Sequence, residues 1–160
     1  MNDWSPEQQI TTLKFGSYSA LFASGMFASK LATNVLSELQ WQWSNWISGL
    51  SLLFALCFLV TVVIWSKKGG NSGGWREILG IYSEEYAREI NNKANSNGFL
   101  AMLLLLLPGY ILGDSKLLSK FDAAVAEVIT LNNYVLLMLV LTSLVWGLTV
   151  LFKLRDEGDS

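Results

Sequence analysis

Long apolar stretches without a charge dominate this chain of 160 residues. The uncharged runs are Trp46–Trp65, Gly98–Gly113 and Val128–Phe152, and a fourth run, Phe15–Leu36, contains one charge, Lys30. About 20 apolar residues in a helix reach roughly 30 Å, the thickness of the hydrocarbon layer of a bilayer. The pattern therefore predicts membrane spans over about 15–36, 46–65, 98–113 and 130–152.

The predicted fold class is an all-α integral membrane protein, with four transmembrane helices in a bundle. Ser51–Ile64 is apolar almost all round, whereas a helix of a soluble protein keeps a polar face. Four such segments leave too little chain to enclose them in a soluble domain. We expect one membrane domain, residues 1–160, without strands, because backbone groups in hydrocarbon must be satisfied within helices.

The first span is the least apolar of the four. Its seven Leu, Phe and Val residues favour insertion by roughly 3 kcal/mol, and a central lysine opposes it by about 2.5–3.5 kcal/mol. The second span has twelve Leu, Ile, Val and Phe residues and no charge, which favours insertion by roughly 5 kcal/mol. The first span is therefore expected to need neighbouring helices.

Small residues in the first span suggest how it meets a neighbour, because a stripe of small side chains lets another helix approach closely. The candidate helix-packing face consists of Ala20, Ser24, Gly25, Ala28, Ser29 and Ala32.

The segments between the spans have recognisable patterns. Ser5 and Pro6 predict the start of a short helix at the membrane surface. Residues 67–97 are expected to form a cytoplasmic helical hairpin segment, with a glycine-rich linker over 69–74 and a helix, capped by Ser83, that runs into the third span. Pro108 should kink or loosen the last turn of that span. Residues 115–129 predict an outer amphipathic helix or an extension of the fourth span.

The basic residues indicate the orientation. If both termini are cytoplasmic, eight Lys and Arg residues lie inside and only Lys116 and Lys120 lie outside. Loops rich in Lys and Arg stay in the cytoplasm, so we expect cytoplasmic N- and C-termini.

Few polar residues lie within the spans. Lys30, Asn34 and Glu38 share one helical face, and Asn132 and Asn133 stand near the entrance of the fourth span. The candidate intramembrane polar site is Lys30, Asn34, Glu38 and Asn132. Lys30 could reach outward to the headgroups, pair with a carboxylate such as Glu38 or Glu127, or line a pathway. The two asparagines point about 100° apart, so at most one faces the bundle.

Composition argues against several kinds of chemistry. The chain has no histidine and one cysteine, Cys57, so metal sites and serine–histidine triads lack their usual residues. Gly69–Gly74 lacks the Gly-Lys-Ser/Thr ending of a phosphate loop. No Lys/Arg cluster suits nucleic acid. We therefore expect no enzyme activity, no cofactor and no nucleic-acid partner.

A pattern precedes the third span: Glu84-Glu85, Ile90, Lys93-Ala94 and Gly98-Phe99. It resembles several uncharacterised families of small bacterial multi-span membrane proteins, which carry an acidic pair, Ile, Lys-Ala and then an aromatic residue at the start of a span. The resemblance covers Glu84 to about Gly113 and implies a bacterial setting, which with the apolar spans means the inner membrane.

Two classes of function remain. The first is a non-enzymatic interaction or regulatory subunit that self-associates or binds another membrane protein, in the lipid bilayer, through the small-residue face. Its candidate cytoplasmic docking residues are Trp75, Tyr82, Tyr86 and Ile90. The alternative is a small homo-oligomeric channel or transporter with Lys30 lining an anion pathway. The scarcity of polar residues in the spans favours the first class.

Overall fold

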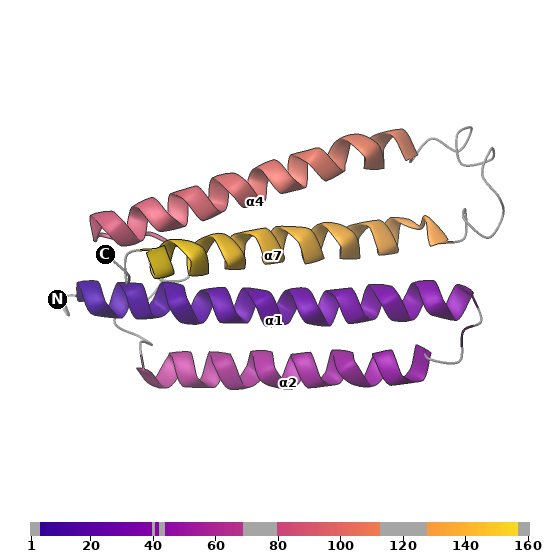
Figure 1. Ribbon diagram of the computed structural model, residues 1–160, viewed down its shortest axis with the longest axis horizontal. Helices are drawn as coiled ribbons and strands as arrows, with labels where there is room; N and C mark the ends of the chain where they lie inside the picture. Colours follow the sequence, from indigo (N-terminus) through magenta and orange to yellow (C-terminus); the bar gives the residue numbers. More distant parts are fainter. Residues whose placement is uncertain (1–3, 40, 42–43, 69–79, 113–127, 157–160) are drawn as a thin grey trace.

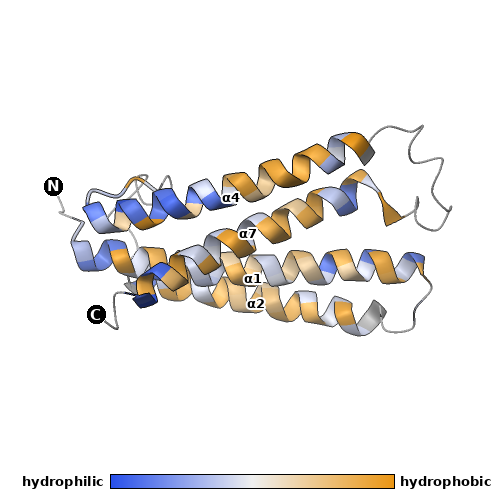
Figure 2. Cartoon of the chain, turned by 45° about the horizontal axis from the view of Figure 1, so that its top comes forward, coloured by the Kyte–Doolittle hydropathy of each residue, from blue (hydrophilic) through white to orange (hydrophobic). Residues whose placement is uncertain are grey.

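Four α-helices account for nearly all of the described chain. The computed structural model describes residues 4–39, 41, 44–68, 80–112 and 128–156. The helices are α1 (Pro6–Glu38), α2 (Ser44–Lys68), α4 (Glu85–Leu112) and α7 (Leu131–Asp156). They alternate in direction, so α1 begins and α7 ends at the same end of the molecule (Figure 1). Polar residues gather at this end (Figure 2), which we call the polar end.

The helices form an open row. α2 packs on α1, α1 packs on α7, and α7 packs on α4, while α1 touches α4 only slightly (Figure 1). α1 and α7 are thus the inner helices. α4 leans away from α1 towards its Leu112 end in both views (Figures 1 and 2). The space between α1 and α4 therefore widens away from the polar end.

Three of the described helices are long and apolar enough to cross a membrane, which agrees with the predicted membrane protein. They are Trp46–Lys67, Glu85–Ile111 and Leu131–Asp156. α1 is not among them, although it is the longest helix in the described residues. It lies inside the row and contacts the other three helices. This inner position agrees with the expectation that the least apolar span needs neighbouring helices.

Large apolar side chains point outward from the outer helices. Leu52 on α2 is 67% exposed, and Leu107 on α4 is 66% exposed. An extended apolar surface of this kind is costly in water but matches the hydrocarbon of a bilayer. The exposed surface therefore has the character of a lipid-facing one.

The buried core lies at the polar end. It consists of Leu13, Tyr82, Ala87, Ile90, Ala94 and Val150, with Trp4, Tyr86, Trp146 and Leu154 packed around it. α1 begins about two turns before the first predicted span, so it reaches the start of α4 outside the apolar layer. Side chains here bury each other as they do in a water-soluble protein.

This core contradicts the predicted cytoplasmic docking surface. Tyr82 and Ile90 are 7% and 1% exposed, and the half-buried Tyr86 donates its hydroxyl to the Lys153 carbonyl at 3.2 Å. Trp75 lies outside the described residues. The prediction was wrong for Tyr82 and Ile90, which lie in the core with residues of the extension of α1 and the end of α7, whereas it stays a prediction for the half-buried Tyr86.

α1 begins with a reciprocal cap. The Gln8 amide donates to Ser5 Oγ at 3.3 Å, and the Ser5 amide donates to Gln8 Oε1 at 3.1 Å. Ser5 is thus the predicted N-cap, with Pro6 in the first turn. The helix is not short, however, because it continues to Glu38.

α4 runs unbroken from the polar end through the third predicted span, as expected. Its N-cap is Glu84 rather than Ser83, since the Ala87 amide donates to Glu84 Oε2 at 2.5 Å. Pro108 lies inside the helix, which continues to Leu112. Tyr134 of α7 packs against Gly109 and donates its hydroxyl to the Leu105 carbonyl. This bond lies in the turn where Pro108 lacks the amide that would otherwise donate to the Leu104 carbonyl.

Two predictions fall outside the described residues: the linker over 69–74, and the amphipathic segment over 115–129 except for its last two residues.

Candidate functional site

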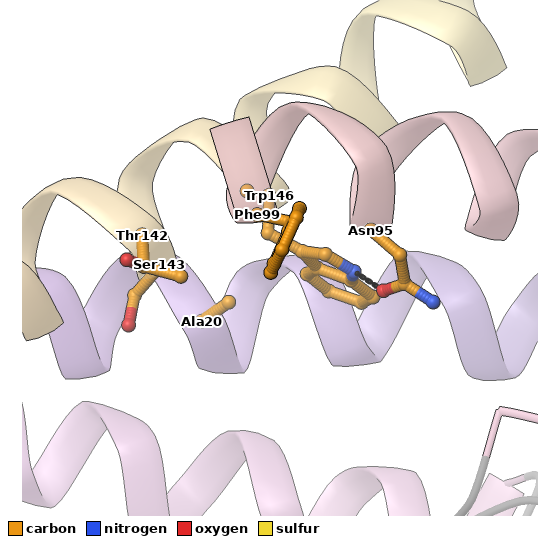
Figure 3. A pocket seen from close by; sticks show the side chains of 7 residues that line it. Ala20, Asn95, Phe99, Thr142, Ser143 and Trp146 are labelled. Atoms are coloured by element: carbon orange, nitrogen blue, oxygen red, sulfur yellow. Dashed lines mark hydrogen bonds between the residues drawn. The ribbon is translucent and has the colours of Figure 1, made fainter. Parts of the chain in front are cut away.

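A shallow groove of about 300 Å³ opens between α1 and α4, and residues of α7 also line it (Figure 3). α7 contributes two hydroxyl groups and an indole ring to it, and α4 contributes an amide, a glycine and an aromatic ring. The lining residues are Ala20, Asn95, Gly98, Phe99, Thr142, Ser143 and Trp146. The groove lies where the apolar part of α4 begins, next to the buried core.

Gly98 of α4 and Gly16 of α1 allow the backbones of these two helices to lie close to Trp146 of α7. A Cβ added at Gly98 would lie 3.8 Å from Cβ of Trp146, and one added at Gly16 would lie 3.5 Å from its ring. The Trp146 indole N–H donates to Asn95 Oδ1 at 2.8 Å (Figure 3). Trp146 therefore links α7 to α4 and contacts α1. It holds the three helices together at the side of the groove nearest the polar end.

Two hydroxyl groups that line the groove make no hydrogen bond within the described chain, unlike several hydroxyls elsewhere in the helices. Ser29, Thr33 and Thr61 each donate to the carbonyl four residues earlier, at 2.8–2.9 Å. Within the part of the chain that the structure describes, the hydroxyls of Thr142 and Ser143 have no such partner. Hydrogen-bonding groups left unused in an apolar layer are costly, so this surface can gain from a polar ligand.

The residues of the predicted intramembrane polar site do not lie together: some are in the contact between α1 and α7, and others are exposed. Asn34 Nδ2 donates to Asn133 Oδ1 at 2.9 Å, and the buried Asn133 donates to the Val128 carbonyl at 2.9 Å. Asn132 is exposed. The choice of Asn132 was therefore wrong, because the neighbouring asparagine is the one that faces α1.

Lys30 and Glu38 lie apart from this asparagine pair. Both side chains are exposed, and neither forms an ion pair with another described residue. The predicted stripe of Lys30, Asn34 and Glu38 thus contributes only Asn34 to the contact between α1 and α7.

The candidate packing face is used inside the chain. Ser24 donates to the Val140 carbonyl of α7 at 3.0 Å, whereas Gly25 faces the Phe54 ring of α2. Ser29 is buried, and Ala28 and Ala32 are half-buried. Only Ala20 lines the groove. The small residues therefore seat two helices of the same chain, and most of them are not available to an external partner.

Sequence reasoning missed most of the groove. Gly98 and Phe99 belong to the motif that precedes the third span, but the sequence does not indicate that they line a groove. The signals for the rest were a Thr142-Ser143 pair and Trp146 within an otherwise apolar span. Their significance depends on the position of α4, which a single sequence does not give.

No family model, curated protein or solved structure matches this chain. The resemblance to small bacterial membrane protein families therefore stays a prediction. Among the residues described, no group of His, Cys, Asp and Glu is placed to hold a metal ion. The evidence for the candidate site therefore comes from the geometry of the groove alone.

Proposed function

We propose that this chain is a non-enzymatic subunit of a membrane complex, and that the groove between α1 and α4 receives a transmembrane helix of a partner protein. The observation that carries the proposal is an open groove with small residues, Ala20 and Gly98, on opposite walls. Small residues let helix backbones approach closely, and the unpaired hydroxyls of Thr142 and Ser143 can hydrogen-bond across the interface.

The open shape of the groove favours a helix over a small molecule. Sites for small ligands usually enclose most of the ligand surface, whereas this groove is shallow and open along one side. A helix needs only one face covered. In this proposal α1 crosses the membrane as a fourth span, both termini are cytoplasmic, and the membrane is the bacterial inner membrane.

Photocrosslinking tests the proposal in native membranes. Benzoylphenylalanine replaces Phe99 in the groove wall, and in the control it replaces Leu53 on α2, which is equally exposed (56% and 54%). We expect a discrete adduct from position 99 and none from position 53. Filling the groove with Ala20→Leu should abolish the adduct. Equal labelling at both positions, or none at 99, would contradict a helix-binding groove.

The same experiment separates self-association from a different partner. An adduct of twice the chain mass of 17.8 kDa means that a second copy occupies the groove. Any other discrete mass means a different membrane protein.

The channel alternative keeps one supporting observation, the exposed Lys30 on α1, which is free of ion pairs among the described residues. Several copies could place these lysines around an anion pathway. Chloride flux in liposomes tests it: no flux from the wild-type protein rejects the channel.

A further inference from the structure

Each of the four helices carries an exposed lysine near the same level of the molecule. The residues are Lys14 on α1, Lys67 on α2, Lys93 on α4 and Lys153 on α7. We call this set the lysine belt. It lies at the boundary between the apolar layer and the polar end.

Contacts between helices place the four lysines at this common level. Gly25 faces Phe54, and counting along the helices puts Lys14 about 17 Å and Lys67 about 20 Å from that contact in the same direction. Asn97 Nδ2 donates to Thr149 at 3.2 Å, and Lys93 and Lys153 each lie four residues, about 6 Å, beyond that bond. Gly147 lies beside Ser17, which links the two pairs. The four levels agree within about one helical turn.

Acidic residues are arranged differently. In the described ranges at this end, Glu7, Glu84 and Glu85 lie about 10–14 Å farther from the apolar layer than the belt lysine of α1 or α4. Glu89, one turn before Lys93, and Asp156, three residues after Lys153, stand at the outer edge of the belt. The surface next to the apolar layer is therefore positively charged, although the chain as a whole carries a net charge of −2.

We propose that the lysine belt binds the phosphate groups of anionic phospholipids in one leaflet and so fixes the depth of the chain in the membrane. The lysines are distributed over all four helices instead of being gathered in one pocket, and headgroups surround a membrane protein in the same way. Lysine side chains at this boundary can extend to the headgroup level while their alkyl stems remain against apolar surface. This inference does not depend on the groove.

The test measures lipid selectivity of the full chain in vesicles of equal parts phosphatidylcholine and phosphatidylglycerol. Spin-labelled phosphatidylglycerol and phosphatidylcholine report association with the protein surface. We expect a several-fold preference for phosphatidylglycerol that falls in high salt, because salt screens exposed charges. Equal association of the two lipids with the wild-type protein would overturn the proposal.

A matched pair of variants on α4 assigns the preference to the belt. Lys93→Gln removes one exposed belt charge, and Arg88→Gln removes one exposed charge from the same helix about 7.5 Å farther from the apolar layer. The belt variant should lose a measurable part of the preference, Lys93→Gln with Lys153→Gln should lose at least half of it, and the arginine variant should keep it. Equal losses would overturn the proposal.

Two further measurements separate lipid binding from misfolding and from a site for free anions. Lys93→Arg with Lys153→Arg keeps the charge and should keep the preference, which excludes a loss caused by misfolding. Added inorganic phosphate should not displace spin-labelled phosphatidylglycerol at matched ionic strength. Displacement would mean a site for free anions and would overturn the lipid assignment.

Discussion

Gln9 illustrates how single residues connect distant parts of this chain. The side chain is 1% exposed, and its Oε1 accepts hydrogen bonds from the amides of Ser83 and Glu84, both at 3.0 Å. Its Nε2 donates to the Trp4 carbonyl at 2.9 Å and to Ser83 Oγ at 2.8 Å. All four hydrogen-bonding positions of the amide are used. Gln9 thus satisfies amides that precede α4, from a different helix.

Replacing Gln9 should destabilise the polar end. Gln9→Leu removes all four of these hydrogen bonds, and each contributes about 0.5–1.5 kcal/mol. We expect the free energy of unfolding to fall by at least about 2 kcal/mol. Denaturation in detergent followed by circular dichroism measures it. Asn92→Leu, at an exposed position of α4, should change the free energy by less than about 0.5 kcal/mol.

The adjacent asparagines provide an internal control for the contact between α1 and α7. Asn133→Leu removes the bond to Asn34 and should lower the free energy of unfolding by about 1–2 kcal/mol. Asn132→Leu changes an exposed side chain and should have little effect. Similar losses in the two variants would mean that the Asn34–Asn133 bond does not stabilise the protein.

Lys30 should oppose insertion of α1 without contributing to its packing. Lys30→Leu should improve insertion by up to about 3 kcal/mol, because a central lysine is unfavourable in hydrocarbon. A glycosylation assay of insertion into microsomes measures this change. Asn34→Leu, one turn away, removes a smaller polar group and should improve insertion less. No gain from Lys30→Leu would mean that position 30 lies outside the hydrocarbon layer.

At the scale of elements, the helices could be predicted from the sequence, but which helices pack against each other could not. Charge-free runs indicated α2, α7 and the second half of α4, and the cap at Ser5 gave the start of α1. The small residues were interpreted as one face, yet Ser24 and Gly25 are adjacent and point about 100° apart. They therefore meet α7 and α2 respectively. The order of helices in the row depends on such contacts between distant segments.

Substitutions at two glycines should distinguish the effect of helix packing on stability from the effect of helix propensity. A Cβ at Gly25 would lie 2.7 Å from the Phe54 ring, whereas one at Gly49 has no neighbour within 4 Å. Gly25→Leu should push α2 away from α1 and lower the free energy of unfolding by about 1–3 kcal/mol. Gly49→Leu should leave it unchanged or raise it by up to about 1 kcal/mol. Denaturation in detergent compares the two variants, and a stable Gly25→Leu protein would contradict tight packing of α1 on α2.

At the scale of the whole molecule, an open row differs from the compact bundle that four apolar segments suggest. A row leaves surfaces of α1 and α7 uncovered, and the groove occupies part of them. The candidate site could not be predicted because it lies where helices fail to meet: Ala20, Gly98 and Thr142 come from three helices. Composition could indicate lipid as the surroundings, but not which faces remain free.

The orientation of the whole molecule can be checked with fusions at the C-terminus. With cytoplasmic termini, a fused green fluorescent protein should fluoresce, and a fused alkaline phosphatase should be inactive. The reverse pair of results would place the lysine belt on the outer leaflet and contradict the expected orientation.

The bonds of Gln9 also have a consequence for biosynthesis. Its partners Ser83 and Glu84 follow it by 74 and 75 residues. At translation rates of about 5–20 residues per second, the ribosome needs roughly 4–15 s to add that stretch. During this interval α1 and α2 emerge while the amide of Gln9 awaits its acceptor and donors, so closure of the polar end is a late step that follows the arrival of α4.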